Sequence, residues 1–390
     1  MKVLFVTYDF PFPITSGGKN RAFNLIKHCA KDADIYLFSF VRDDFHSDFL
    51  DELNKIGVKK TNVHKRKKLS NLLNFPETIL KNSSIFKTLY FENEVVLKLK
   101  EIINEEEIDL VHFESSYTGF YINSDISRMH VKKVLGTENI EFMLYEEYAA
   151  SQNIIKRPLI SYQAGQLKKE ELLMVRNADA VTAVTQKETE ILEALTGKKC
   201  SIVSNGIDPD EFPYKFEERL KNNILFVGNF TYFPNVEAVN FFYENVFEKL
   251  DSKITLTIVG KKAEQTFRFN NHRIIIKDFV EDIISEYRNA DMLVFPIKVG
   301  GGTNFKVLEA MSLGVPIVAY PERLAGLNAV SEEHFLEALR GEEFVNQIER
   351  LYKDLPLREK ITKKSRILIE ENYAWDNIAK DLIKVWRNVL

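Results

Sequence analysis

The chain has 390 residues, 45% of them hydrophobic and 28% charged, and its 53 basic and 57 acidic residues leave a net charge of −4. This composition is that of a globular protein, so it excludes disordered and fibrous chains, and roughly 100–200 residues per domain predicts two domains. A slightly acidic chain lacks the basic domain usual in nucleic-acid-binding proteins, so we expect no nucleic-acid partner. Two cysteines cannot form a disulfide framework, and no apolar run approaches the roughly 20 residues of a membrane span. We therefore expect a cytoplasmic protein whose first residues form a strand rather than a signal peptide.

The first half of the chain alternates between short apolar runs and helical patterns. Lys2–Tyr8 is typical of a buried strand, a loop rich in proline and glycine follows, and Arg21–Ala30 has helical spacing. Further elements are predicted as strands at Ile35–Val41, Asp109–Phe113, Val131–Leu135 and Ala180–Val184, and as a long helix at Leu159–Arg176. This alternation predicts a parallel sheet covered by helices.

A second cycle of the same kind begins after the turn-rich segment Ser204–Phe212. Its strands are predicted at Asn223–Val227, Ile254–Val259, Arg273–Ile276, Met292–Pro296 and Val315–Tyr320, and Asn235–Leu250 has the pattern of an amphipathic helix. The sequence thus predicts an α/β protein with two Rossmann-like domains, residues 1–203 and 204–373. Ligands of open parallel sheets bind beyond the C-terminal strand ends, so we expect the site in a cleft between the domains.

Three consecutive glycines, Gly300–Gly302, follow the strand that ends at Pro296 and precede a helix that Thr303 is predicted to cap. Backbone amides that no side chain shields, at the positive end of a helix, suit a phosphate. Lys306 in the first turn can reach the same anion. The carboxylate of Glu309, three residues further on, can accept hydrogen bonds from sugar or ribose hydroxyls. The alternative is a glycine-rich turn with Lys306 and Glu309 as a surface pair.

In each half, the loop after the first strand is a further candidate for the site. Gly17 and Gly18 precede the first predicted helix and can offer amides to the same anion, or can simply form a flexible connection. Gly228 and Asn229 follow the strand Asn223–Val227, where a single glycine is a weak signal. Neither first strand is followed by G-x-G-x-x-G, which argues against a dinucleotide-dependent oxidoreductase.

Other catalytic motifs are absent from the sequence: there is no G-x-S-x-G elbow, no P-loop and no H-E-x-x-H, and the seven histidines are scattered. We expect His112, at a strand end, to lie in the core or at its rim. Glu138 and Glu141 follow the strand that ends at Leu135. They can act as hydrogen-bond acceptors or as a base, or they can be acids favoured by a helix dipole.

The segment Lys59–Phe86 is distinctive. Six basic residues gather between Lys59 and Lys68 with no acid among them, and a leucine- and phenylalanine-rich stretch follows. A basic patch beside apolar residues suits an anionic membrane surface, here its inner face, or a lipid-phosphate acceptor. The alternative is a solvated loop followed by an ordinary helix.

Together these segments resemble the retaining GT-B glycosyltransferases of family 4. The matching stretches cover most of the chain: Ser16–Gly18, Gly136–Glu141, Asn177–Glu188, Val203–Asp208, Leu225–Val239, Asp278–Ile283, Ala290–Pro296 and, the most specific, Gly300–Ala319. Tyr373 and Trp375 open the last helix, as in the family, and the resemblance implies that residues 374–390 rejoin the first domain. It also implies the GT-B fold, in which two Rossmann-like domains face each other across a cleft.

The resemblance further implies a nucleotide-sugar donor bound mainly by the second domain and a glycan or lipid-linked acceptor on the first. The residues expected at the donor are Glu309 at the ribose, Phe279 and Val280 at the base, and Lys306, Gly301, Gly302, Thr303, Asn304, Gly228, Asn229, Gly17 and Gly18 near the diphosphate. No metal or other cofactor is expected, because the helix dipole and basic residues neutralise the leaving diphosphate. Retention of the anomeric configuration is implied as well.

Three positions depart from the family pattern. Gly301 stands eight residues before Glu309, where the family carries the first of two paired glutamates. Glu138 stands where the family often has histidine. Asn229 stands where a basic residue frequently follows the strand glycine, and Lys298 and Lys261 are candidates to replace it.

We predict a hexosyltransferase, with Lys306, Glu309 and Glu138 as catalytic residues, that moves a hexose-type sugar from a nucleoside diphosphate to a glycan or lipid-linked acceptor in polysaccharide biosynthesis. Two alternatives stay open. A nucleotide-sugar epimerase of the same fold would act without an acceptor, and a non-catalytic partner protein would bind the nucleotide sugar and leave it unchanged.

Overall fold

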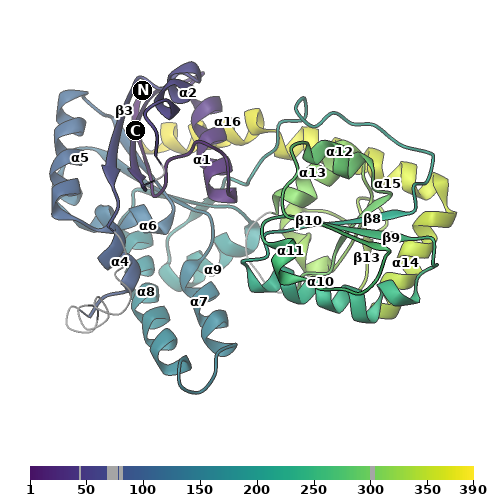
Figure 1. Cartoon of the computed structure of the whole chain (residues 1–390). Helices are drawn as coiled ribbons and strands as arrows, with labels where there is room; N and C mark the ends of the chain where they lie inside the picture. The colour runs from purple at the N-terminus through teal and green to yellow at the C-terminus, as the bar shows by residue number, and fades with distance from the viewer. Residues whose placement is uncertain (44, 68–77, 79–81, 299–303) are drawn as a thin grey trace. The chain divides into compact units, whose positions relative to one another are not determined.

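The computed structural model describes residues 1–43, 45–67, 78, 82–298 and 304–390. It divides into two compact units (Figure 1): unit 1 is Met1–Ser204 with Ile378–Leu390, and unit 2 is Asn205–Asn377. The last helix, α16 (Trp375–Val389), therefore begins in unit 2 and ends in unit 1. Among the described helices, none combines the length and the apolar character needed to cross a bilayer.

Unit 1 is built on a seven-stranded sheet in which every neighbouring pair of strands is parallel. Its strands, in spatial order, are β3 (Lys60–Lys65), β2 (Asp34–Val41), β1 (Lys2–Thr7), β4 (Leu110–Glu114), β5 (Lys132–Thr137), β6 (Ala180–Ala183) and β7 (Cys200–Ile202). Strand order reverses between β1 and β4, because the chain first adds strands on one side of β1 and then on the other.

Helices cover both faces of this sheet, since alternate residues of a buried strand point to opposite faces. Leu4 and Val6 of β1 pack in one cluster with α5, α8 and the short helix η1, whereas Phe5 packs against His112 and Trp386 of α16. The helices of unit 1 are α1 (Gly17–Cys29), α2 (Phe49–Lys55), α4 (Ile85–Tyr90), α5 (Asn93–Glu105), α6 (Ser116–Gly119), α7 (Glu141–Ala150), α8 (Arg157–Asn177), α9 (Gln186–Thr196) and the 3-10 helices η1 (Phe120–Asn123) and η2 (Asp125–Arg128). Figure 1 shows α5 and α1 on opposite sides of the sheet.

Unit 2 repeats the plan with six parallel strands. In spatial order they are β10 (Ile274–Lys277), β9 (Thr255–Val259), β8 (Asn223–Val227), β11 (Met292–Phe295), β12 (Ile317–Ala319) and β13 (Leu336–Glu337). The order reverses between β8 and β11. Its helices are α10 (Phe233–Asn245), α11 (Ala263–Thr266), α12 (Ile283–Arg288), α13 (Phe305–Leu313), α14 (Gly341–Lys353), α15 (Leu355–Leu368), the 3-10 helices η3 (Phe247–Lys249), η4 (Pro321–Arg323) and η5 (Ala325–Leu327), and the π-helical turn η6 (Ile369–Tyr373).

The predicted strands and helices are found close to their expected places, and three differences have a local cause. Helix α1 begins four residues before the predicted Arg21, because the hydroxyl of Ser16 accepts from the amide of Lys19 and caps it. Helix α10 ends at Asn245, short of the predicted Leu250, because Val246 leaves helical geometry. The edge strand β3 was not predicted as a strand, since its lysines make it read as a solvated loop; lysine is a common device for protecting sheet edges.

Candidate active site

The two sheets each have a point where strand order reverses, and ligands of open α/β sheets bind at the C-terminal strand ends there. In unit 2 this point lies between β8 and β11, and in unit 1 between β1 and β4. Most of the predicted site residues follow these strands directly. Each unit is therefore described at its own reversal point.

Lys306 lies at the reversal point of unit 2. It is the second residue of α13, and its Nζ lies 5.5 Å from the ring centre of Phe226 and 5.4 Å from that of Phe295, the aromatic residues near the ends of β8 and β11. The same Nζ donates to Oδ1 of Asn235 at 3.1 Å. Rings and a neutral amide hold the ammonium at the start of the helix, where the helix dipole also favours an anion.

Glu309 follows one turn later on α13 and is held by a tyrosine. The hydroxyl of Tyr287 donates to Oε2 of Glu309 at 2.7 Å and lies 3.1 Å from the carbonyl oxygen of Lys306. Burial raises the pKa of Glu309, while the hydrogen bond from Tyr287 and the charge of Lys306 oppose that rise. The carboxylate is thus oriented by α12 rather than placed as a simple surface partner of Lys306.

Asn235 and Gly228 complete this arrangement. Asn235 of α10 is 6% exposed, and its Nδ2 donates to the carbonyl oxygen of Asn229 at 2.8 Å while its Oδ1 accepts from Lys306. A Cβ on Gly228 would lie 3.1 Å from Cγ of Asn235, so only a glycine leaves that side chain its full space. The loop after β8 therefore positions Lys306 through Asn235.

The remaining predicted residues of unit 2 fall in three places. Phe279 follows β10 and is 79% exposed, and Val280 packs against the core of the unit. Gly301, Gly302 and Thr303 lie outside the described residues. Helix α13 begins at Phe305 with Asn304 as its N-cap, so the prediction that Thr303 caps it was wrong by one residue. Among the described residues, Nδ2 of Asn304 is buried without a hydrogen-bond partner.

Two lysines are the candidates to replace the basic side chain that the family often has at the position of Asn229. Lys298 is exposed and its Nζ lies over the rings of Phe241 and Tyr320, at 5.1 and 5.4 Å. Lys261 is exposed, and its carbonyl oxygen accepts from the amide of Phe230. Asn229 itself accepts from the amide and hydroxyl of Thr231.

The reversal point of unit 1 brings Glu138 to the N-terminus of α1. Gly17 and Gly18 form the first turn of α1 rather than a loop before it. A Cβ on Gly18 would lie 2.9 Å from Oε2 of Glu138 and 2.1 Å from the hydroxyl of Tyr8, so the missing side chain makes room for both groups. Among the described residues, Oε1 of Glu138 is buried without a hydrogen-bond partner.

Burial and the neighbouring charge of Glu114 raise the pKa of Glu138 to about 8, although Arg21 opposes the rise. The carboxyl group is therefore protonated at neutral pH. Since a protonated carboxyl is a hydrogen-bond donor, Glu138 can donate to a ligand, as a histidine at this place could.

A buried network lies directly beneath. Nε of Arg21 donates to Oε1 of Glu114 at 2.6 Å, and Nε2 of His112 lies 2.7 Å from Oε2, with both side chains of the ion pair 1% exposed. The indole of Trp386 donates to Nδ1 of His112 at 3.2 Å, which leaves the imidazole proton on Nε2 to donate to Glu114. Burial alone would raise the pKa of Glu114, but Arg21 and His112 lower it to about 2. His112 is fully buried, so of the two places that the sequence predicted for it, the core and its rim, it lies in the core.

A second group of carboxyls fixes the start of α7. Glu171 of α8 accepts from the hydroxyl of Ser116 at 2.6 Å and from the amides of Glu141 and Phe142 at 3.2 and 3.0 Å. Burial raises the pKa of Glu171 to about 7. Glu141 accepts from the hydroxyl of Tyr117 at 2.8 Å, and burial raises its pKa too. Glu141 lies in the first turn of α7, as one of the two alternatives expected, and it also accepts a hydrogen bond, as the other expected.

The basic part of Lys59–Phe86 is paired with acids from other elements. Lys59 pairs with Asp34, Lys60 with Glu106, Lys65 with Asp43 and Lys67 with Glu92, at 3.3, 2.6, 2.7 and 3.2 Å. Four of the six charges thus face a carboxylate, which the sequence could not show because the acids are distant along the chain. Residues 68–77 and 79–81 lie outside the described residues.

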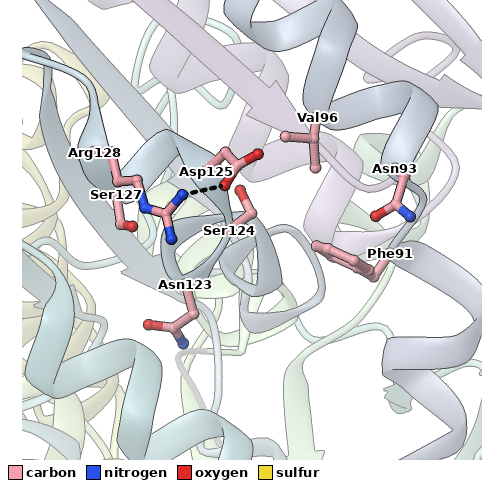
Figure 2. Close-up of a pocket in the computed structure, with 8 residues that line it drawn as sticks. All are labelled: Phe91, Asn93, Val96, Asn123, Ser124, Asp125, Ser127 and Arg128. Carbon is pink, nitrogen blue, oxygen red and sulfur yellow. Dashed lines mark hydrogen bonds and ion pairs between the residues drawn. The ribbon is translucent and has the colours of Figure 1, made fainter.

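A polar hollow of about 270 Å³ opens elsewhere on unit 1, between the start of α5 and η2 (Figure 2). Its lining residues are Phe91, Asn93, Val96, Asn123, Ser124, Asp125, Ser127 and Arg128. Arg128 pairs with Asp125 at 3.3 Å, and Asn123 accepts from Asn177. Because these groups satisfy one another, we assign the hollow no role. Among the described residues, no three His, Cys, Asp or Glu side chains are grouped to hold a metal ion.

Two family models match the chain: Glycosyltransferase Family 4 over residues 15–211 and Glycosyl transferases group 1 over residues 221–354. The first alone spans 197 of the 390 residues. The chain belongs to glycosyltransferase family 4. Gly17, Gly18 and Glu138 of unit 1 lie in the first matched region, and Lys306 and Glu309 of unit 2 lie in the second.

Similar proteins agree with this membership. An uncharacterized glycosyltransferase of Methanocaldococcus jannaschii, MJ1607, is 25% identical over 213 residues, which are 48% of this chain and 54% of that protein, so the match spans about half of the curated relative. Sucrose-phosphate synthase from Thermosynechococcus elongatus has a TM-score of 0.73 at 15% identity, covering 100% and 99% of the two chains. Anabaena HepE in complex with UDP has a TM-score of 0.69 at 14% identity, covering 100% of both. These likenesses show the fold, which is GT-B with two parallel-sheet α/β domains.

Two residues of the site escaped the sequence analysis. Asn235 holds Lys306, and Tyr287 holds Glu309. Asn235 lies within the stretch Leu225–Val239 that resembles the family, so a signal existed, but nothing in the spacing says that its side chain reaches α13. Tyr287 lies five residues before the start of β11, in a segment without a motif.

Proposed function

We propose that this family member transfers a hexose-type sugar from a nucleoside diphosphate to a glycan or lipid-linked acceptor, with retention of the anomeric configuration. Structures of Anabaena HepE are in complex with UDP and with UDP-glucose, which supports a uridine nucleotide sugar as the first donor to test.

One observation carries the proposal: Lys306 and Glu309 lie on the first turns of α13 at the strand reversal of unit 2, each held by a side chain from another element. An ammonium at a helix N-terminus suits a diphosphate, and an oriented carboxylate one turn away suits a pair of ribose hydroxyls. Phe279, exposed at the end of β10, is available to stack on a base.

The bond that breaks is the one between the anomeric carbon and the oxygen of the diphosphate, and negative charge develops on that oxygen. Lys306 and the amides at the start of α13 stabilise this charge, and fixed donors of this kind contribute about 2.7–4 kcal/mol each. The acceptor hydroxyl forms the new bond to the same carbon on the same face and gives its proton to the departing diphosphate. No metal ion or other cofactor is part of the proposal.

Unit 1 supplies the other groups. We place the carboxyl of Glu138, beside Gly17 and Gly18, at the reacting sugar, where its protonated form donates a hydrogen bond. Next to it the rings of Tyr8, Tyr117, Phe86 and Tyr145 form a row in that order, with centroid separations of 5.4, 5.2 and 4.7 Å between successive rings. Aromatic rows of this kind suit the apolar faces of sugars or a lipid chain, so they favour an acceptor on unit 1.

The test is incubation of the purified protein with a panel of nucleoside-diphosphate sugars, with and without candidate acceptors. Release of the nucleoside diphosphate that depends on the acceptor supports the proposal. Isomerised sugar without an acceptor would instead make the protein an epimerase, and tight binding with no product from any donor would make it a binding protein. The anomeric configuration of the product, read by NMR couplings, tests retention separately.

A further inference from the structure

The tip of the hairpin formed by α7 and α8 exposes large apolar side chains that none of the described residues covers. The two helices run side by side, and their connecting turn lies at the bottom of Figure 1, the part of unit 1 farthest from the sheet. Ile154 and Ile155 in this turn are 87% and 84% exposed, and they are the two most exposed large apolar residues among those described. Tyr148 and Leu159, on the adjoining helix ends, are 51% and 43% exposed.

Such a group has a cost in water, because two adjacent isoleucines leave almost their whole surface hydrated. Single exposed apolar residues are ordinary on protein surfaces, but a cluster at the end of a projecting element indicates a contact. The described core clusters account for the packing of α7 and α8 through residues nearer the sheet, such as Phe142 and Leu167. The tip is therefore not needed to hold the hairpin together.

The charge of the tip has one sign. From Tyr148 to Lys169 the sequence contains no Asp or Glu and four basic residues, of which Lys156 and Arg157 directly follow the isoleucines and are exposed. Glu146 and Glu147 precede Tyr148 on α7 and are exposed, and Glu146 pairs with Lys168 at 3.4 Å. The charged residues of the turn itself are therefore Lys156 and Arg157, both cations. Apolar side chains bordered by cations match the two layers of an anionic bilayer surface, acyl chains below phosphates.

The segment that the sequence analysis linked to a membrane is tied to the same hairpin. The amide of Ile85 donates to Gln163 of α8 at 2.7 Å, and Gln166 donates to Asn82 at 2.9 Å. The end of Lys59–Phe86 thus lies along α8. Four of its lysines pair with acids, and among the described residues of this region the most exposed apolar side chains are Ile154 and Ile155 in the turn.

We propose that the α7–α8 turn docks unit 1 on an anionic lipid bilayer, with Ile154, Ile155 and Leu159 in the acyl boundary and Lys156 and Arg157 at the phosphates. A bilayer fits better than a protein partner, because a stable protein interface needs roughly 20–30 residues a side with complementary shape. The tip offers four apolar side chains on a narrow turn, and a fluid surface accepts these without a matching contour. This inference goes beyond the proposed sugar transfer and does not depend on it.

The test is co-sedimentation of the full chain with vesicles, which needs neither donor nor acceptor. The wild-type chain should bind vesicles of phosphatidylcholine mixed with phosphatidylglycerol more tightly than vesicles of phosphatidylcholine alone. The double variant Ile154→Ser, Ile155→Ser should lower the partition coefficient about tenfold or more, because two nearly full isoleucine surfaces no longer leave water. Its matched control is Leu97→Ser, Leu195→Ser, which removes two exposed leucines from α5 and α9 of the same unit and should change binding less than about twofold.

Charge is tested in the same way. Lys156→Glu, Arg157→Glu should abolish the preference for mixed vesicles, whereas Lys187→Glu, Lys199→Glu, the same charge change at exposed positions on and just after α9, should preserve most of it. Equal binding by the tip variants and the wild type would overturn the proposal. Failure of the wild type to bind either vesicle would overturn it as well, and self-association in sedimentation that the isoleucine variant loses would identify a second copy as the partner instead.

Discussion

Both units have a sheet reversal with a cation beside it, but the neighbours of the cation differ between the two units. In unit 1 the cation at this point, Arg21, donates to the buried carboxylate of Glu114, and a second carboxyl, Glu138, sits above it. In unit 2 the cation, Lys306, lies over two phenylalanine rings and donates to a neutral amide. The comparison shows that one topology can surround a cation in two ways: Arg21 faces a buried carboxylate, whereas aromatic rings and an amide lie against Lys306, the residue that our proposal assigns to the donor diphosphate.

The largest expected effect is a loss of stability when the buried ion pair of unit 1 is removed. Arg21→Met leaves Glu114 buried without its cation, so the free energy of unfolding should fall by about 3–5 kcal/mol. Lys277→Met removes a half-exposed partner of Glu286 in unit 2 and should cost less than about 1 kcal/mol. Urea titrations followed by circular dichroism measure both. Equal costs would mean that the Arg21 pair does not hold unit 1 together.

The catalytic side of the comparison is tested at Lys306. Lys306→Ala should lower the rate of sugar transfer by about 10²–10³-fold, since a fixed donor to the leaving group is lost, while the melting temperature changes little. Lys253→Ala is the control, because it removes an exposed lysine that precedes β9, at the edge of the sheet opposite the C-terminal strand ends. Transfer rates of the two variants are compared at saturating donor. A Lys306→Ala enzyme as fast as Lys253→Ala would remove Lys306 from the mechanism.

Glu309 is expected to act in donor binding rather than in the chemical step. Tyr287→Phe deletes the hydroxyl that orients Glu309, which should weaken nucleotide binding by up to about tenfold, the worth of one hydrogen bond to a charged group. Glu309→Ala should weaken it further. Calorimetry with the nucleoside diphosphate measures both, and Tyr373→Phe, at another buried tyrosine of unit 2, controls for the loss of a hydroxyl. Unchanged affinity in Glu309→Ala would contradict the ribose assignment.

The smallest effect concerns Glu138 and depends on pH. Its folded-state pKa of about 8 lies above its ordinary 4.5, so the group keeps its proton at neutral pH and loses it as pH rises through about 8. Transfer by the wild type should therefore fall on the alkaline side, because the ionised carboxylate no longer donates. Glu138→Gln keeps a donor that does not titrate, so it should stay within about threefold at neutral pH and lose this alkaline fall.

Four titratable groups face Glu138. Glu114 and Glu141 raise its pKa and Arg21 lowers it, while the charge of Glu138 in turn raises the pKa of Tyr8. Deprotonation also removes the stability that the protonated form contributes. This contribution to the free energy of unfolding is complete below pH 4.5 and is lost as the pH rises toward about 8. Glu138→Gln should therefore show a smaller fall in stability over this pH range. An identical alkaline profile for Glu138→Gln and the wild type would assign the titration to another group.

Much of the fold follows from the sequence because buried parallel strands are apolar runs of limited length. The strand Asn223–Val227 was predicted with its exact bounds, and most others within two residues. The edge strand β3 could not be predicted, because an edge strand faces water and its lysines hide the pattern. The end of α10 depended on one backbone angle at Val246, which spacing does not encode.

The site was predictable only where one segment carries it. Lys306 and Glu309 share a helix, so their spacing placed them together, and Gly18 and Glu138 were both named although their proximity was not. Asn235 and Tyr287 act through contacts across 71 and 22 residues of chain, respectively, and no local pattern reports such pairs. The pairing of Lys59–Lys67 with acids was hidden for the same reason.

The position of Trp386 has a consequence for biosynthesis. Its indole fills the interior of unit 1 and bonds to His112, 274 positions earlier in the chain. Domains usually fold in the order in which the ribosome delivers them. Here unit 1 is begun first and completed last, because its final segment, Ile378–Leu390, is translated only after all of unit 2. A nascent chain stalled before Ile378 would contain every residue of unit 2 and lack the end of unit 1.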